Sequence, residues 1–323
     1  MDKIAILFNP SSGKGRSLKE KKKIENILTA TGIDYDLFVS ESEEHLRLLA
    51  AGAAGKYPKY PVIVAVGGDT TFNIVAAKIL KQNPAPTMGM IGTGSANDIV
   101  RGLGIHKIAD ACKAIKKGNT RKMDVGCLKL PRGAGDYFFL GTLSAGLGTT
   151  VNRYVEQFHQ KHKLVSKIKL FNLNQTIAGL YGIYDSFSLK RLPLKGEIYY
   201  TDANSGKKIV KEIEFSLLAF MNTPYYANGL KLIEVNASPA LTLFDGLLDC
   251  CVIHTTSFLN TFKIGMKVQK GRHVGRKEFM LLRSTSFKVL LEKVIDIQVD
   301  GEIIEGVEEF EVSVIPGRLT VLC

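Results

Sequence analysis

Residues 62–73, VIVAVGGDTTFN, join a short apolar run to a turn of small and polar residues. The run predicts a buried parallel strand, and the apolar period from Phe72 to Leu80 predicts a helix directly after the turn. Such a turn presents backbone N–H groups and the positive end of a helix dipole, which favour a phosphate. Asp69 in this turn is suited to holding a magnesium-bound water or orienting a reacting hydroxyl. A plain helix-capping turn is the alternative.

Two further turns of small and polar residues also follow strand-length apolar runs. Residues 3–8 lead into Asn9-Pro10-Ser11-Ser12-Gly13, and residues 87–91 lead into GTGSAND at 92–98. The first is not a Walker loop, because Phe8 stands where a glycine is required. The second fits a dinucleotide fingerprint poorly, because its sixth residue is Asn97. Since the carboxyl ends of parallel strands share one sheet edge, we expect the three turns to converge on one crevice.

Alternating strands and helices must position these turns. Apolar patterns predict strands at 3–8, 33–39, 62–67 and 87–91, and helices at 18–28, 43–54, 72–80, 98–103 and 110–117. This alternation is typical of an open parallel α/β sheet. After about Gly126 short β segments dominate as far as residue 322, which predicts an all-β sandwich or barrel. We therefore expect an α/β domain at 1–125 and a β-sandwich domain at 126–323, with a helical insertion near 149–192.

Composition narrows the class of protein. The chain has 323 residues, of which 45% are hydrophobic and 23% charged, as in a globular protein. The five cysteines have no metal-site or disulfide spacing, which favours a reducing cytoplasm. The first residues are too short for a signal peptide, and no apolar run is long enough to span a membrane. The net charge of +12 favours acidic partners, namely nucleotides, nucleic acid or an anionic membrane surface.

The predicted insertion carries many basic residues beside its apolar ones. Ordinary helices with a solvated basic face are one interpretation. A lid that touches an anionic membrane surface is the other. A second basic run at 263–277 supports the membrane interpretation. No aromatic-interleaved nucleic-acid motif accompanies either run, so we expect no nucleic-acid partner.

Two Asp-Gly pairs stand in the β-rich part of the chain, at Asp245-Gly246 and Asp300-Gly301. Asp300 follows a predicted strand at 295–299, so its carboxylate could face the crevice and take a proton from a hydroxyl. Asp-Gly is also a common hairpin dipeptide, and two ordinary hairpin turns remain the alternative.

Five motifs in order now identify a resemblance. They are Asn9-Pro10-x-Ser12-Gly13, Gly67-Gly68-Asp69-x-Thr71-x-Asn73, Gly92-Thr93-x-x-Asn97-Asp98, Asp245-Gly246-x-Leu248-Asp249 and Asp300-Gly301-Glu302. The set resembles the diacylglycerol kinase catalytic-domain family, which also contains sphingosine kinases, ceramide kinases and soluble bacterial lipid kinases. It covers nearly the whole chain, and the length is most similar to the bacterial members.

The resemblance implies an N-terminal domain similar to those of phosphofructokinases and NAD kinases, with ATP in the cleft before a β-sandwich. It implies Asp300 as general base, with Asp69, Asp124 and Glu302 supporting catalysis, Asp124 through a water and magnesium network. It implies a structural metal at Asp245 and the carbonyls of Thr242 and Leu247. The implied nucleotide contacts are Asn9, Pro10, Ser11, Ser12, Gly13, Ser40, Gly67, Gly68, Asp69, Thr70, Thr71, Asn73, Gly92, Thr93 and Asn97.

The expected function is that of an ATP- and Mg2+-dependent lipid kinase of phospholipid metabolism. It would phosphorylate a hydroxyl of a diacylglycerol-like or sphingoid lipid, in the cytoplasm, during transient contact with an anionic membrane. Unpaired sandwich edges would allow a homodimer. Thr70 stands where the family usually has Gly, Ile74 where it has Glu, and Phe244 where it often has an acidic residue. A soluble kinase similar to NAD kinase and a catalytically weakened binding homologue are therefore the alternatives.

Overall fold

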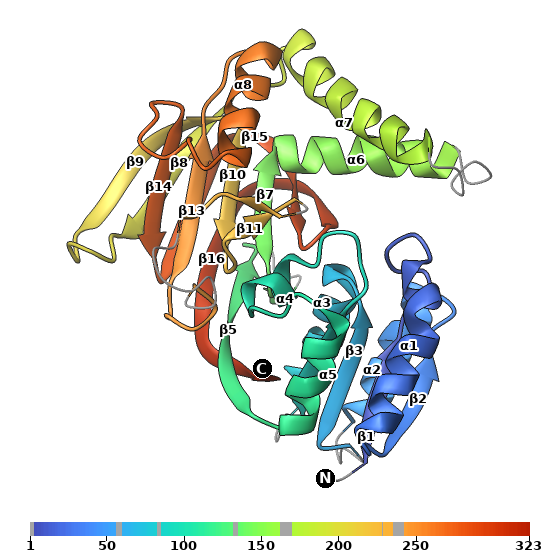
Figure 1. Cartoon of the computed structure of the whole chain (residues 1–323). Coiled ribbons are helices and arrows are strands. Elements are labelled where there is room, and N and C mark those ends of the chain that lie inside the picture. The colour runs from blue at the N-terminus through green and yellow to red at the C-terminus, as the bar shows by residue number, and fades with distance from the viewer. Residues whose placement is uncertain are drawn as a thin grey trace.

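The computed structural model describes residues 3–55, 60–82, 85–131, 135–161, 170–227, 229–234 and 242–323 (Figure 1). Its N-terminal half is built on four parallel strands in the order β4-β3-β1-β2. These are β1 (Ile4–Phe8), β2 (Tyr35–Val39), β3 (Val62–Gly67) and β4 (Thr87–Gly92). The parallel α/β sheet expected from the sequence is confirmed.

Helices cover both faces of this parallel sheet. They are α1 (Arg16–Ala30), α2 (Glu43–Ala53), α3 (Asp69–Ile79), α4 (Asp98–Gly102) and α5 (Ile108–Lys117). Apolar residues of α2 and α3 pack with Ala5 and Leu7 of β1, whereas those of α1 and α5 pack with Ile4 and Ile6. Successive residues of a strand point to opposite faces, so a strand covered on both sides must be apolar throughout.

The C-terminal half is an antiparallel β structure, as expected. Its strands are β5 (Thr120–Lys129), β6 (Tyr137–Phe139), β7 (Thr142–Gly146), β8 (Leu194–Thr201), β9 (Lys208–Phe215), β10 (Leu217–Met221), β11 (Tyr225–Tyr226), β12 (Leu230–Lys231), β13 (Leu248–Ile253), β14 (Phe279–Ser284), β15 (Ser286–Val299) and β16 (Glu302–Leu322). The main path runs β14-β13-β10-β7-β15-β16. Phe220, Phe287 and Phe310 lie at the centre of its apolar core.

Strand β16 joins the two halves into one sheet. It pairs antiparallel with β15 and β5, and its end pairs parallel with β4 through Val321 and Met88. The sequence predicts only short β segments in this part of the chain, whereas β15 and β16 are long and continuous. Register shifts between Leu290 and Ile295, and between Ile315 and Leu319, break the alternation that a single strand would show. The boundary expected at 125/126 falls within β5.

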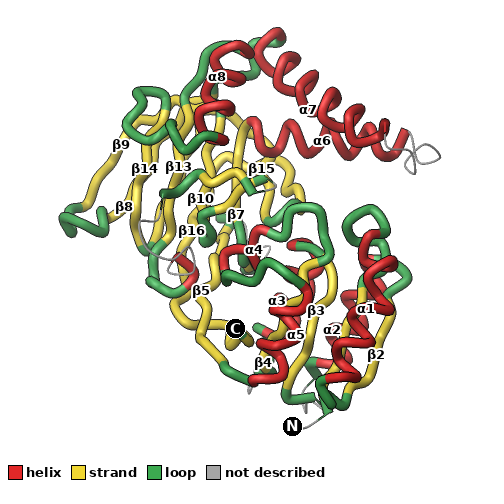
Figure 2. Tube along the Cα trace, viewed as in Figure 1, coloured by secondary structure: helices red, strands yellow, loops and turns green. Residues whose placement is uncertain are grey.

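Three helices gather at one end of the β structure, as Figures 1 and 2 show. These are α6 (Leu147–Lys161), α7 (Leu170–Ser188) and α8 (Phe258–Gln269). The first two occupy the predicted insertion, whereas α8 was not predicted. The basic residues of the insertion at 162–169 lie outside the described residues. Among the helices that the structure describes, none is long and apolar enough to cross a membrane.

Candidate active site

The three small-residue turns meet at the carboxyl edge of the parallel sheet. Backbone N–H groups of Thr93 and Gly94 donate to the Gly67 carbonyl, over 2.7 and 3.0 Å. The Asn9 side-chain nitrogen donates to the Thr71 hydroxyl over 3.0 Å. Turns that are far apart in sequence, by as many as 62 residues, are thus bonded directly to one another. The convergence expected from the strand ends is present.

Glycine is required where these turns touch. A Cβ on Gly94 would lie 2.4 Å from the Gly68 Cα, and one on Gly13 would lie 2.3 Å from the Thr93 carbonyl oxygen. Gly13, Lys14 and Gly15 also adopt left-handed backbone conformations in succession. Such turns expose N–H groups in a concavity that binds anions. Lys14, whose pKa partial burial lowers, was not a predicted site residue, although it stands in the middle of this turn.

Several predicted nucleotide-contact side chains are engaged within the protein. The Thr93 hydroxyl is buried and donates to the Ser17 hydroxyl over 3.0 Å. The buried Ser40 hydroxyl donates to the Phe8 carbonyl over 3.3 Å. Asn97, with φ 56°, donates to the Gly94 carbonyl over 2.9 Å. These three side chains hold the turns in place, so the backbone is the part of the turns best placed to face a ligand.

Ser11, Ser12 and Asn73 complete the turns. The Ser11 N–H donates to the Asn9 carboxamide over 3.1 Å, which shapes the turn that Pro10 begins. A Cβ on Gly68 would lie 3.2 Å from the Ser12 hydroxyl oxygen, so Ser12 borders the second turn. With its amide nitrogen facing acceptors, Asn73 lies 3.2 Å from the Phe138 carbonyl oxygen and 3.3 Å from a carboxylate oxygen of Asp300.

Asp69 caps a helix, but not the one it begins. Its two carboxylate oxygens accept from the backbone N–H groups of Asp98, over 3.1 Å, and Ile99, over 3.0 Å. These groups belong to the first turn of α4, whose N–H groups have no partner within the helix. Burial raises the pKa of Asp69, and the hydrogen bonds from α4 oppose that rise. Asp69 therefore caps a helix, as the alternative interpretation holds, but the helix is α4. Its carboxylate also lies at the crevice.

Asp300 is held by the backbone of the β6–β7 connection. Its carboxylate accepts from the N–H groups of Leu140 at 2.8 Å, Gly141 at 3.1 Å and Thr142 at 2.7 Å. Burial raises the pKa of Asp300 to about 6, the three N–H groups oppose that rise, and the charge of Asp69 adds to it. Asp300 and Gly301, with φ 46° and 95°, also form the turn between β15 and β16. The hairpin turn that the Asp-Gly pair predicts is therefore present.

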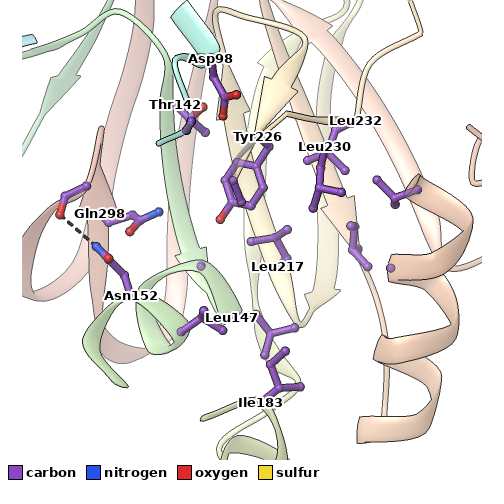
Figure 3. A pocket seen from close by; sticks show the side chains of 18 of the residues that line it. Asp98, Thr142, Leu147, Asn152, Ile183, Leu217, Tyr226, Leu230, Leu232 and Gln298 are labelled. Atoms are coloured by element: carbon purple, nitrogen blue, oxygen red, sulfur yellow. Dashed lines mark hydrogen bonds between the residues drawn. The ribbon is translucent and has the colours of Figure 1, made fainter. Parts of the chain in front are cut away.

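Asp69 and Asp300 face one cavity of about 1040 Å3. Thr70, Asp98 and Thr142 form its polar end with them, and a Cβ on Gly301 would lie 3.7 Å from the Thr70 hydroxyl. The rest of the wall is mostly apolar and comes from α6, α7, α8, β10, β12 and β13 (Figure 3). Its apolar members include Leu147, Val151, Val155, Leu180, Ile183, Leu217, Leu230, Leu232, Ile253, Phe258, Phe262, Ile264, Met266 and Val268.

Asp124 and Glu302 do not line this cavity. The buried Asp124 carboxylate accepts from the N–H groups of Gly246 and Gly317, both over 2.7 Å, and so ties two turns to β5. Glu302 is largely exposed and lies 3.5 Å from Arg47 of α2. Asp124 and Glu302 therefore hold neighbouring elements together around the crevice and do not form its wall.

The predicted structural metal site does not fit its residues. One Asp245 carboxylate oxygen accepts from the Leu247 N–H over 3.0 Å, and the other is paired with the Arg283 guanidinium. Arg283 also lies 3.1 Å from the buried carboxylate of Asp249, whose pKa burial raises to about 6. The described residues hold no group of three or more His, Cys, Asp or Glu side chains that could hold a metal. Arg283 therefore supplies the positive charge beside Asp245.

Two departures from the family pattern have a local explanation. Thr70 lies in the first turn of α3, and its φ is not positive, so the β-branched side chain causes no backbone strain. Thr70 therefore fits the backbone conformation at the start of α3, although the family usually has Gly at this position. Ile74 is buried in the core between α2, α3 and the sheet, where a glutamate would lose its hydration.

Comparisons with known proteins agree with these features. Residues 3–128 match the family described as diacylglycerol kinase catalytic domain, and residues 198–323 match the YegS C-terminal NAD kinase beta sandwich-like domain. The chain is 24% identical over 304 residues to a diacylglycerol kinase of Bacillus subtilis strain 168, covering 94% of this chain and 90% of that protein.

A diacylglycerol kinase of Staphylococcus aureus strain RF122 is 23% identical over 298 residues, covering 92% of this chain and 85% of that one. A crystal structure described as a diacylglycerol kinase from Bacillus anthracis strain Sterne superposes with a TM-score of 0.66 at 19% identity. That superposition covers 99% of this chain and 96% of the other. At this identity the structural likeness shows the shared fold.

Proposed function

The chain belongs to the diacylglycerol kinase catalytic-domain family, with a YegS-type C-terminal domain, and on that premise we propose that it is an ATP-dependent lipid kinase. The observation that carries the proposal is one junction. A glycine-lined, anion-binding edge and two carboxylates, Asp69 and Asp300, meet at the polar end of a large apolar cavity. Phosphoryl transfer needs such positioning and charge stabilisation more than covalent chemistry.

The donor side fits the phosphates of ATP. Gly13, Gly68 and Gly94 leave no side chain between the turns, so backbone N–H groups can approach phosphate oxygens closely. A magnesium ion bound with ATP would neutralise phosphate charge, and Asp69 is the carboxylate best placed to hold it or its water. These contacts would orient the terminal phosphate toward the cavity.

On the acceptor side, Asp300 would take the proton of the reacting hydroxyl. A pKa of about 6 leaves its carboxylate mostly ionised at neutral pH, yet basic enough to accept a proton. Hydrogen bonds from Leu140, Gly141 and Thr142 fix the carboxylate in one orientation. Asn73 links this carboxylate to α3, which begins at the phosphate-binding turn.

The lining of the cavity favours a lipid over a dinucleotide as acceptor. Aliphatic and aromatic side chains from three helices enclose most of it, and its volume is at the upper end of the range for ligand pockets, roughly 300–1,000 Å3. Acyl chains would bury apolar surface there, whereas the ribose and phosphates of NAD would lose hydration without compensation. The soluble kinase similar to NAD kinase is therefore the weaker proposal.

Transfer of labelled phosphate from ATP tests the proposal. The purified protein is incubated with diacylglycerol, a sphingoid base or NAD, each beside Asp300→Asn as the matched control. We expect labelled product from a lipid, and none from NAD. Absence of transfer to any lipid, together with no ATP-dependent rise in Tm, would refute the kinase. Binding of ATP without transfer would instead support the weakened homologue.

We also propose that α8 contacts an anionic membrane surface while the lipid enters. Leu259, Phe262 and Met266 are 66%, 49% and 42% exposed and recur on one helical stripe, beside Lys263 and Lys267 on the next. Phe262 and Met266 also line the cavity, so this stripe borders its opening. Apolar and basic residues on one helix are typical of an interfacial helix.

Sedimentation with lipid vesicles tests this contact. The protein should co-sediment with anionic phosphatidylglycerol vesicles but not with neutral phosphatidylcholine vesicles, and added salt should weaken binding. Leu259→Ser with Lys267→Gln should reduce binding, whereas Lys21→Gln on α1 should not. Equal binding of this pair variant and the wild type would contradict the assignment to α8.

A further inference from the structure

A pair of hydroxyl groups interrupts the apolar wall of the acceptor cavity. The Tyr226 ring stands in the cavity between the polar end, marked by Asp98 and Thr142, and the apolar side chain of Leu217 (Figure 3). Its hydroxyl lies 3.2 Å from the hydroxyl of Ser144 on β7. The cavity thus offers a hydroxyl at Tyr226, beyond the region of Asp300.

The backbone leaves room for this pair. A Cβ on Gly148 would lie 2.2 Å from the Tyr226 hydroxyl oxygen and 2.5 Å from that of Ser144. Any larger residue at this position would displace the tyrosine. Gly148 lies in the first turn of α6 and lines the cavity itself. The hydroxyl pair is therefore a fitted feature of the wall.

Burial decides the direction of the hydrogen bond between the two hydroxyls. Ser144 is 0% exposed, and within the described residues the only partner of its hydroxyl is Tyr226. If Tyr226 donated, the serine hydroxyl hydrogen would be buried without an acceptor, which is costly. Ser144 therefore donates, and the O–H of Tyr226 is left to donate into the cavity. Burial also raises the pKa of Tyr226, so the tyrosine keeps its proton.

Strand register places this donor close to the proposed base. Ser144 pairs with Gln298, and the Asp300 N–H donates to the Thr142 carbonyl, so Ser144 and Asp300 are two residues apart along neighbouring strands. Residues two apart on a strand face the same side and are separated by roughly 7 Å. In a bound lipid, a group that reaches Tyr226 would therefore be only a few covalent bonds away from a hydroxyl held at Asp300.

We propose that Tyr226 donates a hydrogen bond to an acyl carbonyl of the lipid acceptor and so selects acyl-linked glycerolipids. This rests on the proposed lipid kinase function and narrows its substrate class. An ester on the carbon next to the hydroxyl-bearing carbon supplies an acceptor at the required separation. An ether at the same place is a weaker acceptor and has no carbonyl oxygen to reach the tyrosine.

The test compares a diacylglycerol with the dialkylglycerol of the same chain length, which has the same hydroxyl but ether links. For the wild type we expect KM to be about 3- to 10-fold lower for the diester, the effect of one net hydrogen bond. Tyr226→Phe should raise KM for the diester to the diether value and leave kcat nearly unchanged, as loss of uniform binding does. Tyr225→Phe is the matched control, because Tyr225 packs under Arg101 outside the cavity lining.

The outcomes separate this inference from the function on which it rests. Equal KM values for the two lipids in the wild type, or a preference unchanged by Tyr226→Phe, would overturn the role of Tyr226 while leaving the kinase intact. No transfer of phosphate to either lipid would refute both the role of Tyr226 and the proposed kinase function. Ser144→Ala should retain the diester preference, because Tyr226 keeps its donor. Loss of the preference in Ser144→Ala but not in Tyr226→Phe would assign the donor to the serine and refute the direction argued above.

Discussion

Replacing Asp300 with asparagine tests whether its ionised carboxylate takes the acceptor proton. Burial, opposed by three backbone hydrogen bonds and assisted by Asp69, raises the pKa of Asp300 to about 6. A general base acts only when ionised, so the wild-type rate should rise with pH and level off above about pH 7. With that pKa, the rate at pH 5 should be about a tenth of the plateau. Asp300→Asn should lose roughly 100-fold or more of the plateau rate.

The raised pKa also predicts the sign of a stability change. A carboxyl whose folded-state pKa is above its unfolded value of 3.8 stabilises the protein at low pH, and this contribution is lost as pH rises through about 6. Between pH 4 and pH 7 the wild type should therefore lose about 2–3 kcal/mol relative to Asp300→Asn. Urea unfolding at several pH values measures this difference without any substrate.

Initial rates at saturating ATP and lipid, from pH 5 to pH 8, provide the kinetic assay. Dividing the wild-type rates by those of Asp300→Asn removes the titration of ATP itself. Asp296→Asn is the control, because Asp296 lies on the same strand but pairs with Arg153 away from the cavity. A flat wild-type profile, or a plateau rate of Asp300→Asn above about a tenth of wild type, would refute the assignment of Asp300 as base.

Four further predictions concern Gly94, Arg283, the absence of a structural metal, and Thr70. Gly94→Ala places a Cβ 2.4 Å from a backbone atom, so it should lower the free energy of unfolding by roughly 1–3 kcal/mol and abolish the ATP-dependent rise in Tm. The control Gly52→Ala, whose Cβ would have no atom within 4 Å, should have neither effect. Arg283→Met leaves the buried Asp249 carboxylate without a cation and should lower the free energy of unfolding by roughly 2–4 kcal/mol. The wild-type Tm should be the same in EDTA and in Mg2+ without nucleotide, and a chelator-sensitive Tm would contradict the arginine-filled site. Thr70→Gly should cost about 0.5–1 kcal/mol in urea unfolding, and a gain in kcat of tenfold would show that Thr70 crowds the nucleotide.

Local pattern was sufficient to predict where the three small-residue turns meet. Strands β1, β3 and β4 are apolar on both faces, so their ends could be located from the sequence, and the topology of a parallel sheet places those ends together. The burial of the Ser40 and Thr93 hydroxyls could not be predicted, because it depends on which partner each meets in the fold. Helix α8 was not predicted, because it has apolar residues on its exposed side as well as on its buried side, and these obscure the helical period.

The acceptor side depends on long-range contacts that leave little local signal. Leu140 and Thr142 hold Asp300 through backbone N–H groups, which any residue type could supply. Ser144 and Tyr226 are 82 residues apart, and no periodicity links them. Arg283 and Asp245 are 38 residues apart, so the Asp-Gly motif gave no sign of the guanidinium that pairs with this carboxylate. Motifs therefore located the carboxylates but not their partners.

The length of β16 fixes the Asp300 turn relative to the glycine-rich turns. This strand begins directly after the Asp300 turn and ends at Leu322, and it pairs with β4 of the parallel sheet through Val321. Asn73 reaches Asp300 from α3, and Arg47 of α2 reaches Glu302, so side chains also bridge the halves near the crevice. Continuous backbone hydrogen bonding resists bending more than a loop does, because each opening leaves paired groups unsatisfied. The distance between Asp300 and the glycine-rich turns is therefore set mainly by the sheet itself. If a lipid enters the cavity as proposed, we expect the motion to occur in the helices α6, α7 and α8 that enclose it.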